Sequence, residues 1–210
     1  MELEIPRRKD EDKGAGNKLV GWKILSPRGA CRFCDRRLRE WYRRLAFSIL
    51  FFGKPIKIDP SSWISRRSVI RESGGGSITI GRNCEIHDFA MIMTYGGHIV
   101  IGDNCSVNPF TLLYGHGGVK IGTGVRIAAH TVIIPANHYP GGDERPLYKL
   151  GVTGKGIVIS DHVWIGAGCL ILDGVTIGRN AIIGAGSVVT KSVPANATAV
   201  GVPARVVGQR

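Results

Sequence analysis

The sequence has no apolar segment near its N-terminus that could act as a secretory signal, because its first residues are polar and charged. Its longest strongly apolar run, Leu45–Phe52, is shorter than the ~20 residues that a membrane-spanning helix needs. The 5 cysteines are an odd number, which does not suit a fully paired disulfide framework. Together these features predict a protein of a reduced, cytoplasmic compartment.

Two further motifs are missing. Cys31 and Cys34 form a Cys-x-x-Cys pair without a second pair, whereas a structural zinc site usually has four ligands. We therefore expect no metal or redox function there. No serine or cysteine nucleophile motif is evident either, so an enzyme with this sequence is not expected to form a covalent intermediate.

Acidic residues are few, 16 against 28 Lys and Arg, and the formal net charge is +12. Such a balance suits an anionic ligand, an acidic glycan, a membrane surface or nucleic acid. No aromatic and basic face or recognised motif supports the last of these, so no nucleic-acid partner is expected. Much of the charge lies in the first part of the chain, at Arg7, Arg8, Lys9, Arg32, Arg36, Arg37, Arg39, Arg43 and Arg44.

Glycine, by contrast, is abundant: 30 of the 210 residues are glycine, about twice the ~7% share of an average protein. From Ile58 onward an aliphatic residue recurs every six positions, in groups of three. Between groups the steps are ten, nine, eight, twenty-six and six residues, so every insertion falls at one corner of a three-sided coil. The pattern predicts an all-β fold, a parallel β-helix of about six triangular coils that are stable only when stacked. The groups begin with Ile58, Ile80, Ile101, Ile121, Ile159 and Ile177.

A second column lies four residues after each aliphatic residue and holds small or β-branched side chains. We expect this column to point inward as well. Three cysteines belong to it and are predicted to be buried, inert thiols. The column includes Ser62, Ser68, Gly74, Cys84, Ala90, Gly96, Cys105, Thr111, Gly117, Asn137, Cys169 and Ser187.

These features predict three regions. Residues 56–194 form the β-helix with a long loop over 134–158, and residues 195–210 form a C-terminal segment. Residues 1–55 are a basic extension, disordered over 1–25 and helical over 35–52. The helix is basic in its first half and apolar in its second, and two interpretations stay open. It caps the open end of the β-helix, or it makes a peripheral contact with the cytoplasmic face of a membrane.

The six-residue pattern resembles the hexapeptide-repeat acyltransferases. The likeness covers roughly residues 58–208. Its last part is similar to a subgroup that contains maltose and galactoside, nodulation, streptogramin and surface-polysaccharide acetyltransferases. This resemblance implies a left-handed β-helix, a homotrimer and acetyl-CoA as co-substrate. The residues that carry it are Ile101-Gly102-Asp103-Asn104, Val163-Trp164-Ile165-Gly166-Ala167, Ile183-Gly184-Ala185-Gly186-Ser187 and Gly201-Val202-Pro203-Ala204-Arg205.

The resemblance also implies a catalytic base. Ala136-Asn137-His138 matches the family's catalytic histidine, and His138 opens the only long insertion between the predicted coils. Acetyl transfer from a thioester needs a base for the acceptor proton, donors for the oxyanion and a meeting of the two substrates. An imidazole can serve as this base near neutral pH. Direct attack in a ternary complex is the simpler hypothesis.

The other site residues are also implied by the family. Small residues at two of the expected coenzyme A contacts would let the backbone approach the pantetheine arm, while basic residues could meet phosphates. Trp164 would wall the site or merely cap a coil. For the acceptor, Asn108 matches a sugar-binding position, and His116 stands where galactoside enzymes carry an acid. Asp143 could orient His138 or the acceptor, or be a solvated loop acid. The coenzyme A contacts are Ala167, Ala185, Thr190, Lys191, Arg205 and Trp164.

His98 and the two histidines already named, His116 and His138, fall at one column of corners, which raises a metal site as an alternative. The carbonic anhydrases of this fold use a closer histidine pair than the intervals of eighteen and twenty-two residues found here, so no metal is expected. The favoured function is O-acetylation of a sugar or surface-polysaccharide hydroxyl. N-acetylation of an amino sugar or antibiotic, and a non-catalytic scaffold, remain the alternatives.

Overall fold

The computed structural model of the protein describes residues 53, 55–139, 146 and 149–209. The predictions for residues 1–52, a disordered segment, a helix over 35–52 and an isolated cysteine pair, lie outside the described residues, and so does Asp143. In the described part, no helix is both long and apolar enough to cross a membrane.

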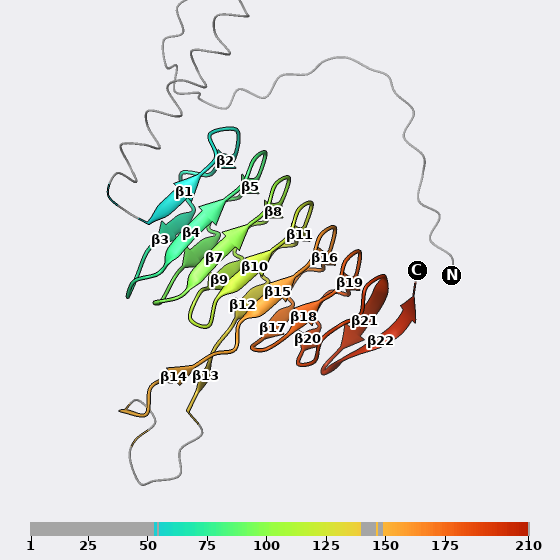
Figure 1. Ribbon diagram of the computed structural model, residues 1–210. Helices are drawn as coiled ribbons and strands as arrows, with labels where there is room; N and C mark the ends of the chain where they lie inside the picture. The colour runs from blue at the N-terminus through green and yellow to red at the C-terminus, as the bar shows by residue number, and fades with distance from the viewer. Residues whose placement is uncertain (1–52, 54, 140–145, 147–148, 210) are drawn as a thin grey trace, which may run out of the picture.

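Three parallel sheets, named faces A, B and C, wind around one axis as stacked coils (Figure 1). Face A contains β1 (Ile56–Ile58), β4 (Ser77–Ile80), β7 (His98–Ile101), β10 (Val119–Ile121), β15 (Ile157–Ile159) and β18 (Thr176–Ile177). Face B contains β2 (Trp63–Ile64), β5 (Glu85–Ile86), β8 (Ser106–Val107), β11 (Arg126–Ile127), β16 (Trp164–Ile165) and β19 (Ile182–Ile183). Face C contains β3 (Val69–Arg71), β6 (Met91–Met93), β9 (Leu112–Tyr114), β12 (Val132–Ile134), β17 (Leu170–Leu172) and β20 (Val188–Val189).

This architecture confirms the predicted left-handed parallel β-helix of about six coils. The strand register confirms the grouping in threes, because the first aliphatic residue of each group stands beside that of the next group on face A. These side chains belong to one hydrophobic core that runs along the axis. A single coil could not bury them alone, so the core depends on stacking. The ladder is Ile58, Ile80, Ile101, Ile121, Ile159 and Ile177.

Three edges separate the faces. The AB edge connects face A to face B, for example residues 81–84, and the BC edge connects face B to face C, for example residues 166–169. The CA edge leads from face C to the next coil, for example residues 115–118, and carries all of the insertions, as predicted. The coils approach closely at these edges. A Cβ atom on Gly102 would lie 2.7 Å from the backbone of Gly122, so no side chain fits there.

The second predicted column is right at two edges, and at the third it is right only in the last coils, where Val175 and Val193 are buried. Its members at the AB and BC edges are mostly buried, as Ser62 and Thr111 are. At the CA edge, Gly74, Gly96 and Asn137 are exposed, because the insertions move these positions into surface loops. There the inward positions are instead the early residues of the face A strands, namely Ile56, Ile78, Ile99, Val119 and Ile157.

The three column cysteines are buried and unpaired, as predicted. All three thiols donate to glycine carbonyls in the next coil, Cys84 to Gly102 and Cys105 to Gly122 at 3.0 Å, and Cys169 to Gly184 at 3.2 Å. Burial raises the pKa of the Cys169 thiol. A buried thiol that stays protonated is a poor nucleophile, so Cys169 contributes packing rather than chemistry.

The long insertion begins as a two-stranded ribbon that projects from the stack (Figure 1). β13 (Asn137–His138) pairs antiparallel with β14 (Val152–Thr153). Asp173, on the next coil, holds the base of this ribbon. One carboxylate oxygen accepts the backbone amides of Lys155 and Gly156 at 2.8 and 3.0 Å, and the other accepts the Asn137 side-chain amide at 3.2 Å.

The C-terminal segment is a hairpin rather than another coil. β21 (Ala197–Gly201) extends face B in parallel with β19, and β22 (Ala204–Gln209) returns antiparallel along β21. The hairpin covers the edge of face B at the last coil, which would otherwise present unpaired backbone groups.

Candidate active site

His138 stands on the projecting ribbon at the CA edge. Its side chain is exposed, and its register partner across the ribbon is Val152. Because the ribbon is anchored through Asp173, the imidazole is held on a defined strand rather than on a free loop. An exposed base on a fixed backbone is the arrangement that proton abstraction from a bound acceptor requires.

His116 lies on the preceding turn of the same edge. Its ring stacks on Tyr95 with a centroid separation of 4.7 Å, and Tyr114 approaches it edge-on at 6.0 Å. Burial, and then the charge of His138, lower the pKa of His116, which therefore favours the neutral form.

The Nδ1 atom of His116 is buried and has no hydrogen-bond partner among the described residues. A buried polar atom without a partner costs free energy, so water, an ion or a ligand normally completes such an atom. This observation agrees with the predicted acceptor-binding role of His116. That role remains a prediction.

The expected pantetheine contacts lie on a different edge. Ala167 and Ala185 are exposed at the BC edge. Each is followed by a glycine, Gly168 or Gly186, and a Cβ atom on either glycine would have no other atom within 4 Å. Among the described residues, no group accepts a hydrogen bond from the backbone amide of either alanine. Trp164 stands beside them on face B, where its side chain is 54% exposed. The edge is thus open and offers two amide donors.

The expected phosphate contacts are spread over the last coils. Thr190 and Lys191 are exposed and follow β20 at the CA edge. Arg205 is exposed on β22 opposite Val200, and its guanidinium donates only to the Ala204 carbonyl, at 3.0 Å. Both basic groups are therefore accessible to an anionic ligand near the C-terminal end of the stack.

Asn108, the predicted sugar-binding residue, lies on the BC edge. Its side-chain NH₂ donates to the Ile127 carbonyl at 2.8 Å, in addition to the bond from its own backbone amide. This bond fixes the side chain between two coils. The amide oxygen of Asn108 is the group that remains for a ligand.

The candidate residues of one chain therefore do not form one site. His116 and His138 occupy the CA edge, whereas Asn108, Ala167 and Ala185 occupy the BC edge. Face C spans the distance between the two edges. Each group of residues is gathered at its own edge, but the two groups lie on opposite sides of face C.

An aromatic column along the BC edge was not anticipated. Phe89 stacks on Phe110, and Phe110 stacks on His130, each with ring centroids 5.0 Å apart. The Arg67 guanidinium lies 5.9 Å from the centroid of the Phe89 ring. All four residues stand three positions after an inward aliphatic residue, so the six-residue period could have revealed the column. It ends next to the coil of Ala167.

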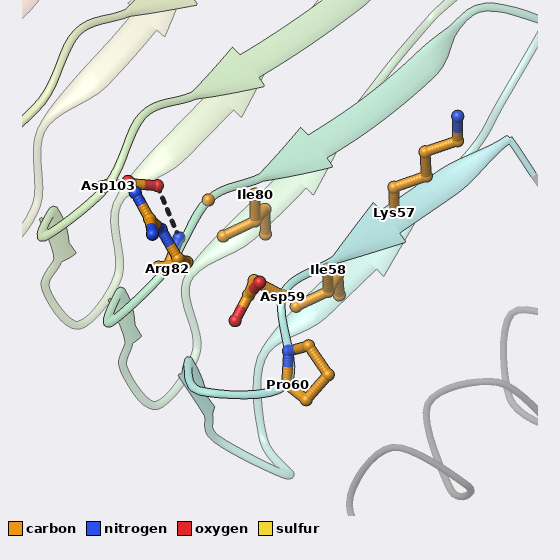
Figure 2. A pocket seen from close by; sticks show the side chains of 8 residues that line it. Lys57, Ile58, Asp59, Pro60, Ile80, Arg82 and Asp103 are labelled. Carbon is orange, nitrogen blue, oxygen red and sulfur yellow. Dashed lines mark hydrogen bonds and ion pairs between the residues drawn. The ribbon is translucent and has the colours of Figure 1, made fainter.

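The hollows on the described surface include a basic groove and a pocket that contains an ion pair. A groove of about 400 Å³ follows face A beside the CA edge and includes Lys120 and Lys155, which sequence reasoning did not single out. A second hollow of about 490 Å³ lies at the AB edge of the first coils (Figure 2). In it Arg82 pairs with Asp103 at 2.7 Å, and hydrogen bonds from Arg82 lower the pKa of Asp103. Because these charges satisfy each other, the second hollow is a poor candidate for chemistry.

The alternative of a histidine metal site finds no support in the geometry. Within the described ranges, no three His, Cys, Asp or Glu side chains are grouped so that they could hold a metal ion. His98 begins β7, and its Nδ1 lies 2.9 Å from the Ser77 hydroxyl.

Comparison with known proteins agrees with this architecture. Residues 156–191 match the family described as bacterial transferase hexapeptide (six repeats). The galactoside O-acetyltransferase of Lactococcus lactis is 39% identical over 87 residues, and that of Escherichia coli is 39% identical over 92 residues. These matches cover 41% and 42% of this chain and 41% and 43% of the two enzymes. The chain thus spans less than half the length of these relatives.

Among solved structures, a mutant of AntD, an N-acyltransferase from Bacillus cereus in complex with dTDP-4-amino-4,6-dideoxyglucose and coenzyme A, has a TM-score of 0.67 and 27% identity. The match covers 80% of this chain and 89% of AntD. The three stacked parallel sheets and the six-residue period define the protein as a parallel β-helix with hexapeptide repeats. In its repeat the chain is similar to the bacterial transferase hexapeptide family over residues 156–191, and to these acyltransferases.

Proposed function

We propose that the protein is a homotrimeric, acetyl-CoA-dependent O-acetyltransferase that acts on a hydroxyl of a sugar or surface polysaccharide, with His138 as general base. The observation that carries this proposal is the division of the candidate residues between the CA edge and the BC edge. Each half lacks what the other supplies, since one holds the imidazoles and the other the open backbone amides. A second copy of the chain would complete the site.

Face C supports such an assembly. From β6 to β20 its outward side chains are aliphatic, methionine or tyrosine and none is charged, whereas face A presents Lys57 and Lys120 and face B presents Glu85 and Arg126. Because face C lies between the two edges, three copies that turn it toward a common axis would set the CA edge of one copy against the BC edge of the next. The outward residues include Met91, Leu112, Tyr114, Val132, Ile134, Leu170, Leu172 and Val188.

The proposed reaction has two steps, the attack of the acceptor on the thioester and the loss of the coenzyme A thiolate. His138 accepts the proton of the acceptor hydroxyl while that oxygen attacks the thioester carbonyl carbon. The carbon–sulfur bond then breaks, and the departing thiolate of coenzyme A takes the proton. The amides of Ala167 and Ala185 would hold the pantetheine arm, and Lys191 and Arg205 would meet the phosphates. Asp143 would lie beside the acceptor, and Trp164 beside coenzyme A.

Turnover of acetyl-CoA tests this function. We expect free thiol to be released from acetyl-CoA in the presence of a saccharide acceptor, and mass spectrometry of the product to show an added acetyl ester. The panel should hold neutral sugars, polysaccharide repeat units and amino sugars. If acetyl-CoA does not bind to the protein, the catalytic proposal fails and a scaffold role replaces it.

N-acylation of an amino sugar is the second candidate. Similarity to AntD, whose complex contains an amino sugar nucleotide and coenzyme A, favours it. The base and the thioester chemistry would be the same. An amide that survives mild alkali, in place of an alkali-labile ester, would identify N-acylation.

The trimer gives a separate prediction. Val132→Asp places a charge at the centre of face C and is expected to reduce the molecular mass from three times 22.6 kDa to that of the single chain. Light scattering after size exclusion measures this. Thr79→Asp, on the outward side of face A, should leave the mass unchanged. A monomeric wild type, or a Val132→Asp protein that stays trimeric, would contradict the assembly.

Location remains part of the proposal. The cytoplasmic compartment indicated by the cysteines suits an enzyme that uses acetyl-CoA. Contact of residues 35–52 with a membrane stays a prediction that concerns residues outside the described ranges.

A further inference from the structure

The groove on face A has an unbalanced charge. Its lining includes Lys120, Lys155 and His98, with Gly117 and Gly156 among the small residues of its floor. No carboxylate is among the lining residues. A concave surface of one charge sign raises the local concentration of ligands of the opposite sign.

The two lysines are available to a ligand. In the described part of the chain, neither Lys120 nor Lys155 takes part in an ion pair. Asp173, which precedes the groove residue Gly174, already accepts the backbone amides of Lys155 and Gly156 and the side-chain amide of Asn137. The Asp173 carboxylate therefore holds the ribbon, and within the described residues it forms no ion pair with Lys120 or Lys155.

The groove reaches the proposed acceptor site. Gly117, in its lining, directly follows His116. Lys155 is three residues from Val152, so the Cα atoms of Lys155 and Val152 lie within about 11 Å of each other. Val152 is the register partner of His138. A short saccharide that offers a hydroxyl to His138 could extend into the groove.

The phosphates of coenzyme A have other candidate partners. Lys191 follows β20 and Arg205 lies on β22, both nearer the C-terminal end of the stack than Lys120 on β10. The lysines of the groove are therefore free to serve the acceptor.

We infer that this groove binds an anionic group of the acceptor, so that the acceptor is an acidic saccharide. The anion is the carboxylate of an acidic sugar residue or the diphosphate of a nucleotide-linked sugar, both of which offer several oxygens to two ammonium groups. This inference rests on the proposed function for its reaction, and on the charges of the groove alone for its ligand.

Kinetics with charge-removing variants test the inference. Lys120→Gln and Lys155→Gln should each raise the KM for an acidic acceptor about tenfold, equivalent to ~1.4 kcal/mol, and should leave kcat and the KM for acetyl-CoA unchanged. The matched control is Lys57→Gln, because Lys57 is in the same outward row of face A but lines the other hollow. A rise in the KM for acetyl-CoA instead would assign the groove to coenzyme A and overturn the inference.

Equilibrium binding separates this inference from the proposed function. A uronic-acid oligosaccharide, a sialic-acid oligosaccharide and a dTDP-sugar are titrated into the whole protein without acetyl-CoA, beside a carboxyl-reduced form of the first. We expect at least one anionic probe to bind, with affinity about tenfold weaker in Lys120→Gln, and the neutral form to bind equally to both proteins. The probe that binds identifies carboxylate or diphosphate. If none binds, or if the neutral form binds as tightly, the inference is wrong whether or not acetyl transfer occurs.

Discussion

Replacement of His138 by alanine is expected to lower kcat for acetyl transfer by about 100-fold or more, because general-base catalysis typically contributes that factor. The affinity for acetyl-CoA should change little, since the expected cofactor contacts lie on the BC edge and on the last coils. Steady-state release of free thiol from acetyl-CoA measures kcat, and equilibrium titration measures the binding. The two quantities together distinguish a missing base from a collapsed site.

A matched histidine serves as control. His162 is exposed on the AB edge with a φ of 59°, at a position where other coils carry Asn83, Asn104 and Asn180 with the same left-handed backbone. His162→Asn should therefore fold normally and keep the wild-type kcat. A His138→Ala protein that retains more than a tenth of the wild-type kcat would show that another group removes the acceptor proton.

The largest expected effect on stability is at the centre of the core. Ile133 lies in β12, is 0% exposed, and stands in register between Leu113 and Ile171 of the adjacent coils. Ile133→Ala removes packed methyl and methylene groups and leaves a cavity, so the free energy of unfolding should fall by about 2–5 kcal/mol. Because stacked coils are stabilised mainly by their neighbours, damage to this coil weakens the contacts on both of its sides.

Two substitutions calibrate this result. Ile133→Val should cost only about 0.5–1.5 kcal/mol, and Val207→Ala, at a side chain that is 63% exposed, should stay within about 0.5 kcal/mol of wild type. Urea denaturation at one fixed protein concentration measures all three, since assembly makes stability depend on concentration. Equal losses at Ile133 and Val207 would mean that the coil core does not dominate stability.

The repeat was readable from the sequence because it is local. Each strand is followed by a corner of nearly constant length, so residues six apart occupy equivalent places, and Ile80 and Ile101 stand in register. The inward cysteines followed from the same period. The prediction was wrong where that constancy ends, because insertions at the CA edge carry Gly74 and Asn137 to the surface and move the inward place to Ile78 and Ile157.

The candidate site shows a different division. Resemblance to a family supplied residue types such as His138 and Ala167, but it could not reveal that one chain keeps them on separate edges. The buried Nδ1 of His116 and the charge of the groove at Lys120 and Lys155 were likewise invisible, because they depend on which loops and coils are adjacent in space.

The sequence by itself determined the three-sided coil, the inward aliphatic ladder and the single corner that accepts insertions, because a six-residue period requires only short-range geometry repeated along the chain. The tertiary structure alone decided that face C is apolar between the two halves of the site, and that a basic groove runs along face A at the CA edge. Those properties arise from the stacking of coils and from the ribbon of residues 137–153, which bring together side chains that no short sequence interval connects.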